Sequence, residues 1–323
     1  MARLGIAFSG GPTPAEIVDS IKLAEELGYE SAWVAEGHGG DQFATLAAAA
    51  AQTSRIGLGT GITSVFVRTI PTIAMAAASV DDISGGRFIL GIGSSHKVQV
   101  EGEHGVAYTK PLTRTREAVA AIRTLLCDHT LRYEGETFRI ERFDLWFSPK
   151  RPPPPVYLSA VFPKMTELTG EIADGLILTR STLATGAAAR RSLAQGAARA
   201  GRDPATIAVT TLLPSAVADT RAEALAVLRP GLGFYLGFFP RYNRLLAEAG
   251  FAEECAEIAA AFARGDRDGA VRATTDAMID ATSIAGTPAQ CRERIERTGN
   301  RASSCQSSAP MRAVPAPRRG SRR

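Results

Sequence analysis

Short apolar runs alternate with amphipathic segments along most of the chain. Residues 4–8 form an apolar run of the length of a buried strand, and glycines follow it. Pro14 then opens an amphipathic segment that stops at Gly28, as a helix would. Repetition of this unit predicts strands at 4–8, 31–35, 56–63, 88–92, 156–160, 175–179 and 207–213. The remaining segments predict helices at 14–27, 41–52, 71–83, 112–127, 164–173, 183–200 and 288–295, and an irregular helical region at 220–264.

Short apolar strands separated by helices are typical of a parallel sheet that is buried on both faces. Seven such strands follow one another without a change in composition that would divide the chain. The pattern therefore favours an α/β fold of the (β/α)8 TIM-barrel type over a doubly wound sheet, with residues 1–297 as one domain. Alternating residues near 131–147, around Glu134-Gly135-Glu136, predict a hairpin inserted into this domain.

The C-terminal segment 298–323 breaks the pattern. A barrel needs an eighth apolar strand after the helix at 288–295, but this segment has almost no aliphatic residues and contains six arginines. We therefore predict that the eighth strand is missing or replaced by a disordered, arginine-rich tail. A changed reading frame or a truncated gene would explain so sharp a break, and a naturally disordered end is the alternative.

The net charge of +4 depends on that tail. Of the 37 lysines and arginines, six lie in 298–323, which leaves 31 against 33 acidic residues in the rest of the chain. The predicted domain is thus slightly acidic and has no basic stripe with interleaved aromatic residues, which argues against a specific nucleic-acid partner.

Composition narrows the class of protein further. A hydrophobic content of 45% and a charged content of 22% exclude a fibrous or disordered chain. The four cysteines are far apart and have no histidine at metal-ligand spacing, so they are interpreted as reduced thiols and no metal is expected. No apolar stretch reaches the ~18 residues of a membrane span, and no signal peptide is recognised at the N-terminus. These features predict a cytoplasmic protein without a membrane partner.

The residues that follow the strands are the candidates for chemistry, because in a parallel barrel the carboxyl ends of all strands converge on one mouth. Glycines and small residues dominate there, which favours the close approach of a planar ligand. The alternative interpretation is that each of these glycines only allows the chain to turn from a strand into the following helix. The titratable groups are Glu36, His38 and His96, for which a solvated or hydrogen-bonded loop position is the alternative.

Three motifs of common enzyme classes are absent from the sequence. There is no dinucleotide fingerprint, no Walker loop and no G-x-S-x-G elbow.

Two further features have more than one interpretation. Lys164, at the start of a helix, is a candidate phosphate ligand or a solvated side chain. The aromatic run from Gly231 to Tyr242 is loop-like and fits a lid or substrate wall, an oligomer contact or core packing equally well.

The segment GLGTGITSVFVRTIPTIAMAAASVDDISGGRFILGIG, residues 57–93, resembles the signature of the luciferase-like flavin and deazaflavin oxidoreductases. Residues 28–59, 155–178 and 284–297 are similar to the coenzyme F420-dependent branch that includes methylenetetrahydromethanopterin reductase. The resemblance covers residues 3–297. It implies a TIM barrel that binds F420 in its mouth, where a bulge with a non-prolyl cis peptide in the third strand backs the deazaflavin ring.

The resemblance also implies roles for individual residues. Glu36 matches the acidic position after the second strand, and His38 is the other catalytic candidate there, although Gly37-His38 departs from the Asp-His or Glu-His pair of the family. The residues implied to contact the cofactor are Thr60, Gly61 and Ile62 at the bulge, Gly93, Ser94, Ser95 and His96 beside the ring, and Ser159, Ala160, Lys164 and Thr179 along the tail.

The sequence thus predicts an F420-dependent oxidoreductase that transfers a hydride between the deazaflavin and a small organic substrate. An FMN-dependent luciferase-like monooxygenase is one alternative. An inactive product of a C-terminally altered gene is another, because losing a barrel strand exposes edges and part of the core. The substrate is not identified, and a homodimer is left open.

Overall fold

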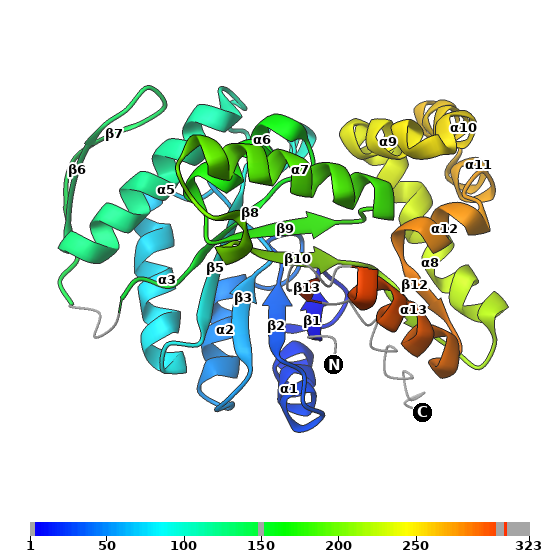
Figure 1. Cartoon of the computed structure of the whole chain (residues 1–323), viewed down its shortest axis with the longest axis horizontal. Helices are drawn as coiled ribbons and strands as arrows, with labels where there is room; N and C mark the ends of the chain where they lie inside the picture. Colours follow the sequence, from blue (N-terminus) through cyan, green and yellow to red (C-terminus); the bar gives the residue numbers. More distant parts are fainter. Residues whose placement is uncertain (1–3, 148–151, 302–306, 309–323) are drawn as a thin grey trace, which may run out of the picture.

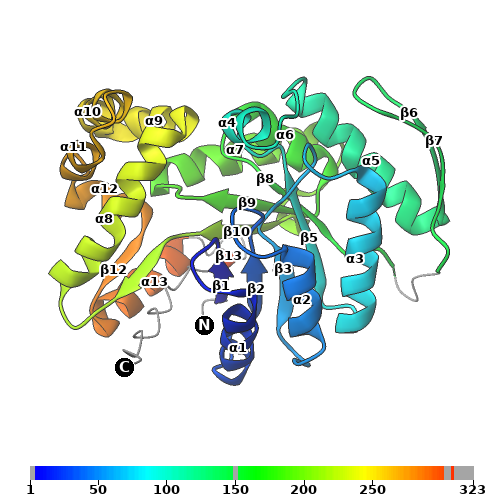
Figure 2. The same cartoon turned by 180° about the vertical axis from the view of Figure 1, so that it is seen from behind.

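The computed structural model describes residues 4–147, 152–301 and 307–308 (Figure 1). Within this part of the chain, parallel strands lie at the centre and helices cover their outer side (Figures 1 and 2). The neighbouring strands are β1 (Gly5–Phe8), β2 (Ser31–Val34), β3 (Gly57–Thr60), β5 (Phe88–Gly93), β8 (Val156–Ser159), β9 (Gly175–Thr179) and β10 (Ala208–Leu212). Each pairs in parallel with the next, which confirms the predicted parallel barrel.

The eighth position of the barrel holds two described residues. The strand β13 (Ser307–Ser308) pairs in parallel with β10 through Val209 and Thr210. Among the described residues no pairing joins β13 to β1, so the ring is nearly closed. The sequence predicts no strand here, and the difference arises because backbone N–H and C=O groups can pair whatever side chains they carry. Residues 302–306 and 309–323 of the predicted tail lie outside the described residues.

The helices around the strands follow the predicted order, with two short additions. They are α1 (Pro14–Glu26), α2 (Gln42–Ala50), α3 (Ile70–Ser84), α4 (Lys97–Gly102), α5 (Pro111–Asp128), α6 (Pro163–Ile172), α7 (Leu183–Arg199) and α13 (Pro288–Arg301), with a short η1 (Pro204–Thr206). The short α4 and η1 are not among the predicted helices. Local chemistry fixes their ends. Thr13 and Glu16 form a capping box at the start of α1, and Asp41 caps α2. Gly85, with φ of 74°, ends α3 in the left-handed region.

Two insertions depart from the simple repeat. The predicted hairpin is present as β6 (Thr130–Glu134) and β7 (Arg139–Asp144), which lie to one side of the barrel (Figure 1). A helical segment lies on the opposite side and consists of α8 (Arg221–Phe238), α9 (Pro240–Leu246), η2 (Ala247–Phe251), α10 (Ala252–Ala263), α11 (Arg267–Arg272) and α12 (Asp276–Thr282). It is bracketed by β11 (Ser215–Val217) and β12 (Ile284–Gly286), which pair with each other.

The core has separate parts. The largest lies between the strands and the helices α1 to α5, and the helical segment has its own cluster, which includes Leu232, Leu236 and Ile258. Ala7, Trp33, Ile177 and Leu212 form a small cluster of their own within the strands. Trp33 is 2% exposed, and its indole N–H donates to Ser31 Oγ at 3.0 Å.

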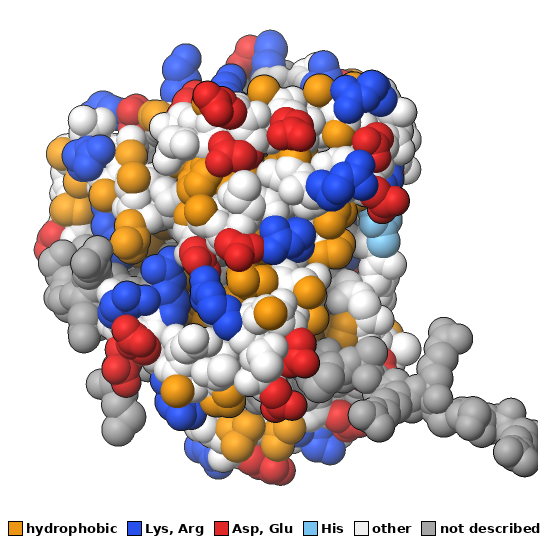
Figure 3. Space-filling view, turned by 90° about the vertical axis from the view of Figure 1, so that its right-hand side faces the viewer, with side chains coloured by type: hydrophobic (Ala, Val, Ile, Leu, Met, Phe, Trp, Pro, Cys, Tyr) orange, Lys and Arg blue, Asp and Glu red, His pale blue; other side chains and the backbone are white. Residues whose placement is uncertain are grey.

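Outside the core, the surface mixes both signs of charge. The face that carries the helical segment shows acidic and basic side chains interspersed (Figure 3). Of the helices that the structure describes, none combines the length and apolar character needed to cross a bilayer.

Candidate active site

The chain bulges between β3 and β4 (Thr63–Ser64), at the barrel mouth. The peptide bond between Gly61 and Ile62 is cis, which confirms the expectation for this position. Gly61 N–H donates to the Val34 carbonyl at 2.8 Å, and Ile62 C=O accepts from Glu36 N–H at 3.2 Å. The bulge is therefore held to the end of β2 on both sides of the cis bond.

The carboxylate of Glu36 anchors the chain beyond this bulge. Its Oε2 accepts from Ser64 N–H at 2.8 Å and from the Thr63 hydroxyl at 3.3 Å, and its Oε1 accepts from Arg68 Nε. Arg68 also donates to Asp41 at 2.5 Å. Glu36 and Arg68 are only 16% and 22% exposed, so the ion pair is largely withdrawn from solvent. Both oxygens are engaged within the protein, which makes Glu36 a positioning residue in this geometry.

Replacing Glu36 with glutamine is expected to lower the free energy of unfolding by about 1–3 kcal/mol, because it leaves Arg68 with one carboxylate partner in a partly desolvated site. Urea unfolding measures this change. Glu103→Gln is the matched control, since Glu103 pairs with the exposed His38, and its expected loss is below about 0.5 kcal/mol. Equal effects of the two substitutions would show that Glu36 does not anchor the bulge.

Two predicted site residues lie at the surface. The His38 side chain is 77% exposed, and its Nε2 lies 2.9 Å from Glu103 Oε2. This contact joins the loop after β2 to the end of α4. Lys164 is exposed in the first turn of α6. Neither side chain packs against the bulge.

Small residues form the floor of the mouth beside the bulge. A Cβ atom at Gly93 would lie 3.3 Å from Ile62 Cδ1 and 3.4 Å from Ser159 Cβ. Glycine at this position therefore lets Ile62 and Ser159 come together over the end of β5. The structure thus brings together Gly61, Ile62, Gly93 and Ser159, which are four of the predicted cofactor contacts.

The neighbouring strand ends complete this floor. Thr60 is fully buried, and its hydroxyl donates to the Gly91 carbonyl at 2.7 Å. Ala160 is 5% exposed and donates its N–H to the Ile177 carbonyl at 3.2 Å. Thr179 is the last residue of β9 and is paired in register with Leu212. Thr60 and Ala160 thus lie beneath the mouth, and a cofactor would instead meet the half-buried Ile62, Ser159 and Thr179.

The segment after β5 turns sharply into α4. Ser95 has φ of 56°, a left-handed conformation that is uncommon for residues other than glycine. Ser94 Oγ accepts from the hydroxyl of Tyr108 at 3.0 Å. This turn directs His96 toward the helical segment.

His96 lies within an aromatic cluster. Its ring centroid is 4.1 Å from that of Phe239, 5.5 Å from that of Tyr242 and 6.4 Å from that of Tyr235. Burial, with a smaller contribution from the nearby Arg241 cation, lowers the pKa of His96 to about 4. The imidazole is therefore neutral near pH 7, and it links the barrel mouth to the helical segment.

The prediction of a loop-like aromatic run from Gly231 to Tyr242 is wrong, because these residues belong to α8 and α9. The glycines serve close packing. A Cβ at Gly237 would lie 2.2 Å from the Phe262 ring, and one at Gly233 would lie 2.9 Å from Thr274 Oγ1. The core-packing alternative therefore accounts for much of the run, while Tyr235 and Tyr242 also face the site.

Sequence reasoning missed Arg180, the residue directly after β9. Its backbone has φ of 47°, and its guanidinium carbon lies 4.2 Å from the centroid of the Tyr235 ring. The available signal was its place at a strand end, next to the predicted Thr179. In the part of the chain that the structure describes, no three His, Cys, Asp or Glu side chains are grouped to hold a metal ion.

A family model described as luciferase-like monooxygenase matches residues 2–303, which is nearly the whole chain. The chain belongs to the luciferase-like family. Its TIM-barrel fold, with the bulge after the third strand, agrees with this membership. Enzymes of the family among its neighbours are oxidoreductases and monooxygenases.

Individual members of the luciferase-like family resemble the chain closely. A 5,10-methylenetetrahydromethanopterin reductase from Methanolobus tindarius is 32% identical over 294 residues, covering 90% of this chain and 89% of the relative. The reductase of the same name from Archaeoglobus fulgidus is 31% identical, covering 91% and 89%. The structure of the coenzyme F420-dependent tetrahydromethanopterin reductase from Methanopyrus kandleri superimposes with a TM-score of 0.85 at 27% identity, covering 97% of this chain and 93% of that one.

Proposed function

We propose that this protein is an F420-dependent oxidoreductase that transfers a hydride between the deazaflavin and a small organic substrate. The observation that carries the proposal is the floor of the barrel mouth, where Gly61, Ile62 and Ser159 lie half-buried around Gly93 and Ile62 is the one large side chain among them. The similarity to reductases that are named for this chemistry supports it. When bound, F420 supplies a carbon that accepts or donates hydride.

The residues of this chain would hold the cofactor and exclude water. Gly61 and Ile62 would lie behind the ring, and Ser94, Ser95 and His96 would border it. A neutral His96 can hydrogen-bond to a polar ring atom without adding charge to the mouth. Ala160, Thr179 and Lys164 follow β8 and β9 and would flank the cofactor tail.

Little acid–base machinery enters this proposal. Glu36 contributes by fixing the strand beyond the bulge through Ser64 and Arg68. The catalytic role of His38 stays a prediction, because its exposed ring contacts Glu103 only at the rim. Hydride transfer depends chiefly on how well the two reacting carbons are oriented and shielded from water.

A fluorescence titration with F420 and FMN, side by side, tests the proposal. The purified protein is expected to bind F420 at least tenfold more tightly than FMN, because the floor and strand ends suit the deazaflavin of its reductase relatives. Exclusive binding of FMN, together with oxygen-dependent turnover of the reduced flavin, would instead establish a monooxygenase. Binding of neither cofactor would indicate an inactive chain.

The cytoplasm as the place of action belongs to the same proposal, because F420 and small organic substrates are dissolved metabolites. A homodimer stays a prediction that gel filtration can test.

A further inference from the structure

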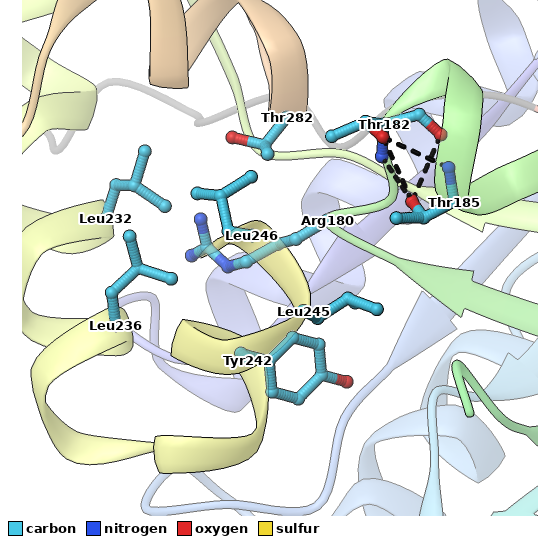
Figure 4. A pocket seen from close by; sticks show the side chains of 9 residues that line it. All are labelled: Arg180, Thr182, Thr185, Leu232, Leu236, Tyr242, Leu245, Leu246 and Thr282. Carbon is cyan, nitrogen blue, oxygen red and sulfur yellow. Dashed lines mark hydrogen bonds between the residues drawn. The ribbon is translucent and has the colours of Figure 1, made fainter. Parts of the chain in front are cut away.

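A pocket opens between the end of β9, the start of α7 and the helical segment (Figure 4). The guanidinium of Arg180 extends into it toward Leu236 and Leu246. The hydroxyl-bearing residues Thr182, Thr185 and Thr282 line other parts of its wall. An apolar wall with a few polar groups is typical of a small-molecule pocket.

The charge of Arg180 has no carboxylate partner among the described residues. Among the other half-buried arginines, Arg68 pairs with Glu36 and Asp41, whereas Arg87 and Arg114 donate to backbone carbonyls. The neighbours of Arg180 are the phenols of Tyr235 and Tyr242. Burial raises the pKa of both phenols, so they are neutral at physiological pH. The pocket therefore holds one positive charge and no negative one from the described chain.

Such an arrangement is costly for the folded protein. Withdrawing a cation from water without a counter-charge is unfavourable, and a left-handed backbone at a residue other than glycine adds strain, here at φ of 47°. The ring of Tyr235, 4.2 Å away, offsets part of that cost by a cation–π contact. A cation kept at such cost is typical of a binding site that completes its charge balance with a ligand.

The pocket adjoins the proposed active site through shared aromatic residues. Tyr235 and Tyr242, which face Arg180, also pack on His96 at the barrel mouth. A small molecule could thus place its reactive carbon in the mouth and a charged end beside Arg180.

We infer that Arg180 binds an anionic group, a carboxylate or a phosphate, of the substrate, so that this enzyme acts on an anionic small molecule. A planar guanidinium can donate two parallel hydrogen bonds to either group. Thr182 and Thr185 line the same pocket at the start of α7, where the Thr185 N–H donates to Thr182 Oγ1 at 3.1 Å. The inference rests on the proposed function, and the anionic tail of the cofactor is the rival occupant.

Anion binding without any cofactor tests the inference. Wild-type protein is titrated with inorganic phosphate and with acetate at constant ionic strength, and the melting temperature is recorded. A saturable rise is expected with at least one of them, because a ligand that binds the folded state stabilises it. Arg180→Met should weaken this binding at least tenfold, and Arg180→Lys should weaken it less. Arg241→Met is the matched control, because Arg241 is an exposed arginine near His96 that does not line the pocket, and it should leave the binding unchanged.

Two further measurements on Arg180→Met distinguish a substrate site from a structural role of Arg180 and from a site for the cofactor. Without an anion, Arg180→Met should melt at or above the wild-type temperature, because it removes an unpaired cation; a fall of more than about 5 °C would show a structural role and overturn the inference. The affinity for F420 should stay within twofold of wild type, and a tenfold loss would assign the anion site to the cofactor. Failure of wild type to bind F420 would sink the proposed function alone, whereas absence of saturable anion binding would sink this inference alone.

Discussion

Replacing Gly91 with alanine is expected to lower the free energy of unfolding by at least ~3 kcal/mol, a large part of the ~5–15 kcal/mol typical of a folded domain. A Cβ at this position of β5 would lie 1.9 Å from the Thr60 carbonyl oxygen and 2.9 Å from Ile177 Cδ1. The backbone cannot simply move away. Gly91 N–H donates to Thr60 Oγ1 at 2.9 Å, and the same hydroxyl donates to the Gly91 carbonyl at 2.7 Å.

Gly231→Ala is the matched control for this prediction. Gly231 lies inside α8, is exposed, and has no atom within 4 Å of an added Cβ. Alanine should therefore stabilise the protein by about 0.5–1 kcal/mol through its higher helix propensity. Chemical denaturation followed by circular dichroism measures both variants. A Gly91→Ala protein as stable as wild type would mean that β3 and β5 do not pack as described.

The stability of the wild-type protein is expected to fall as the pH is lowered from about 6.5 to about 4, through His96. Burial, and to a smaller extent Arg241, lowers the pKa of the folded imidazole from 6.5 to about 4. Between about pH 4 and pH 6.5 the imidazole of His96 is protonated in the unfolded chain but not in the folded one. The contribution of His96 to the free energy of unfolding therefore rises with pH over this range and is constant above it. A shift of this size corresponds to about 2–3 kcal/mol, after allowance for partial exposure.

His96→Phe should remove this part of the pH dependence, because phenylalanine fits an aromatic cluster and does not titrate. The measurement is the difference in unfolding free energy between variant and wild type at pH 4.5 and at pH 7.5. Other groups that titrate in the window cancel in that difference. His104→Gln is the control, since His104 is exposed and its loss should leave the profile unchanged. Parallel profiles for wild type and His96→Phe would place His96 in solvent.

Most of the barrel could be predicted from the sequence because its signals are local. The strand at 175–179 agrees with β9 at both ends, and Pro14 and Asp41 mark helix starts through their own chemistry. The long strand predicted at 56–63 is interrupted instead, since the cis bond after Gly61 separates β3 from β4. Apolar pattern alone does not reveal such a break; the family resemblance did.

What the sequence could not show depends on contacts between distant segments. The glycines of α8 look like turn signals, and only the approach of Phe262 and Thr274 reveals why they are glycines. The pairing of β11 with β12 joins segments separated by the whole helical insertion. Arg180 lies in a pocket whose described lining contains no acidic residue, and the sequence around Arg180 does not show which side chains will surround it.

In the C-terminal segment, the pattern of apolar residues also failed to predict where the elements end. The helix predicted to end at 295 continues as α13 to Arg301, inside the stretch expected to be a tail. The pair of serines in β13 then meets β10 without any apolar signal. Disorder of the remaining tail stays a prediction.

The affinity of Gly93→Val for F420 tests most directly whether the mouth floor holds the deazaflavin. Valine would push against Ile62 and Ser159, whose Cδ1 and Cβ atoms lie 3.3 and 3.4 Å from the added Cβ. Ile62 is predicted to back the ring, and Ser159 to flank the cofactor tail. The dissociation constant for F420 should rise at least tenfold, while Gly102→Val, at the open end of α4, should leave it within twofold. If Gly93→Val remains folded and binds F420 as tightly as wild type does, the cofactor does not lie on this floor.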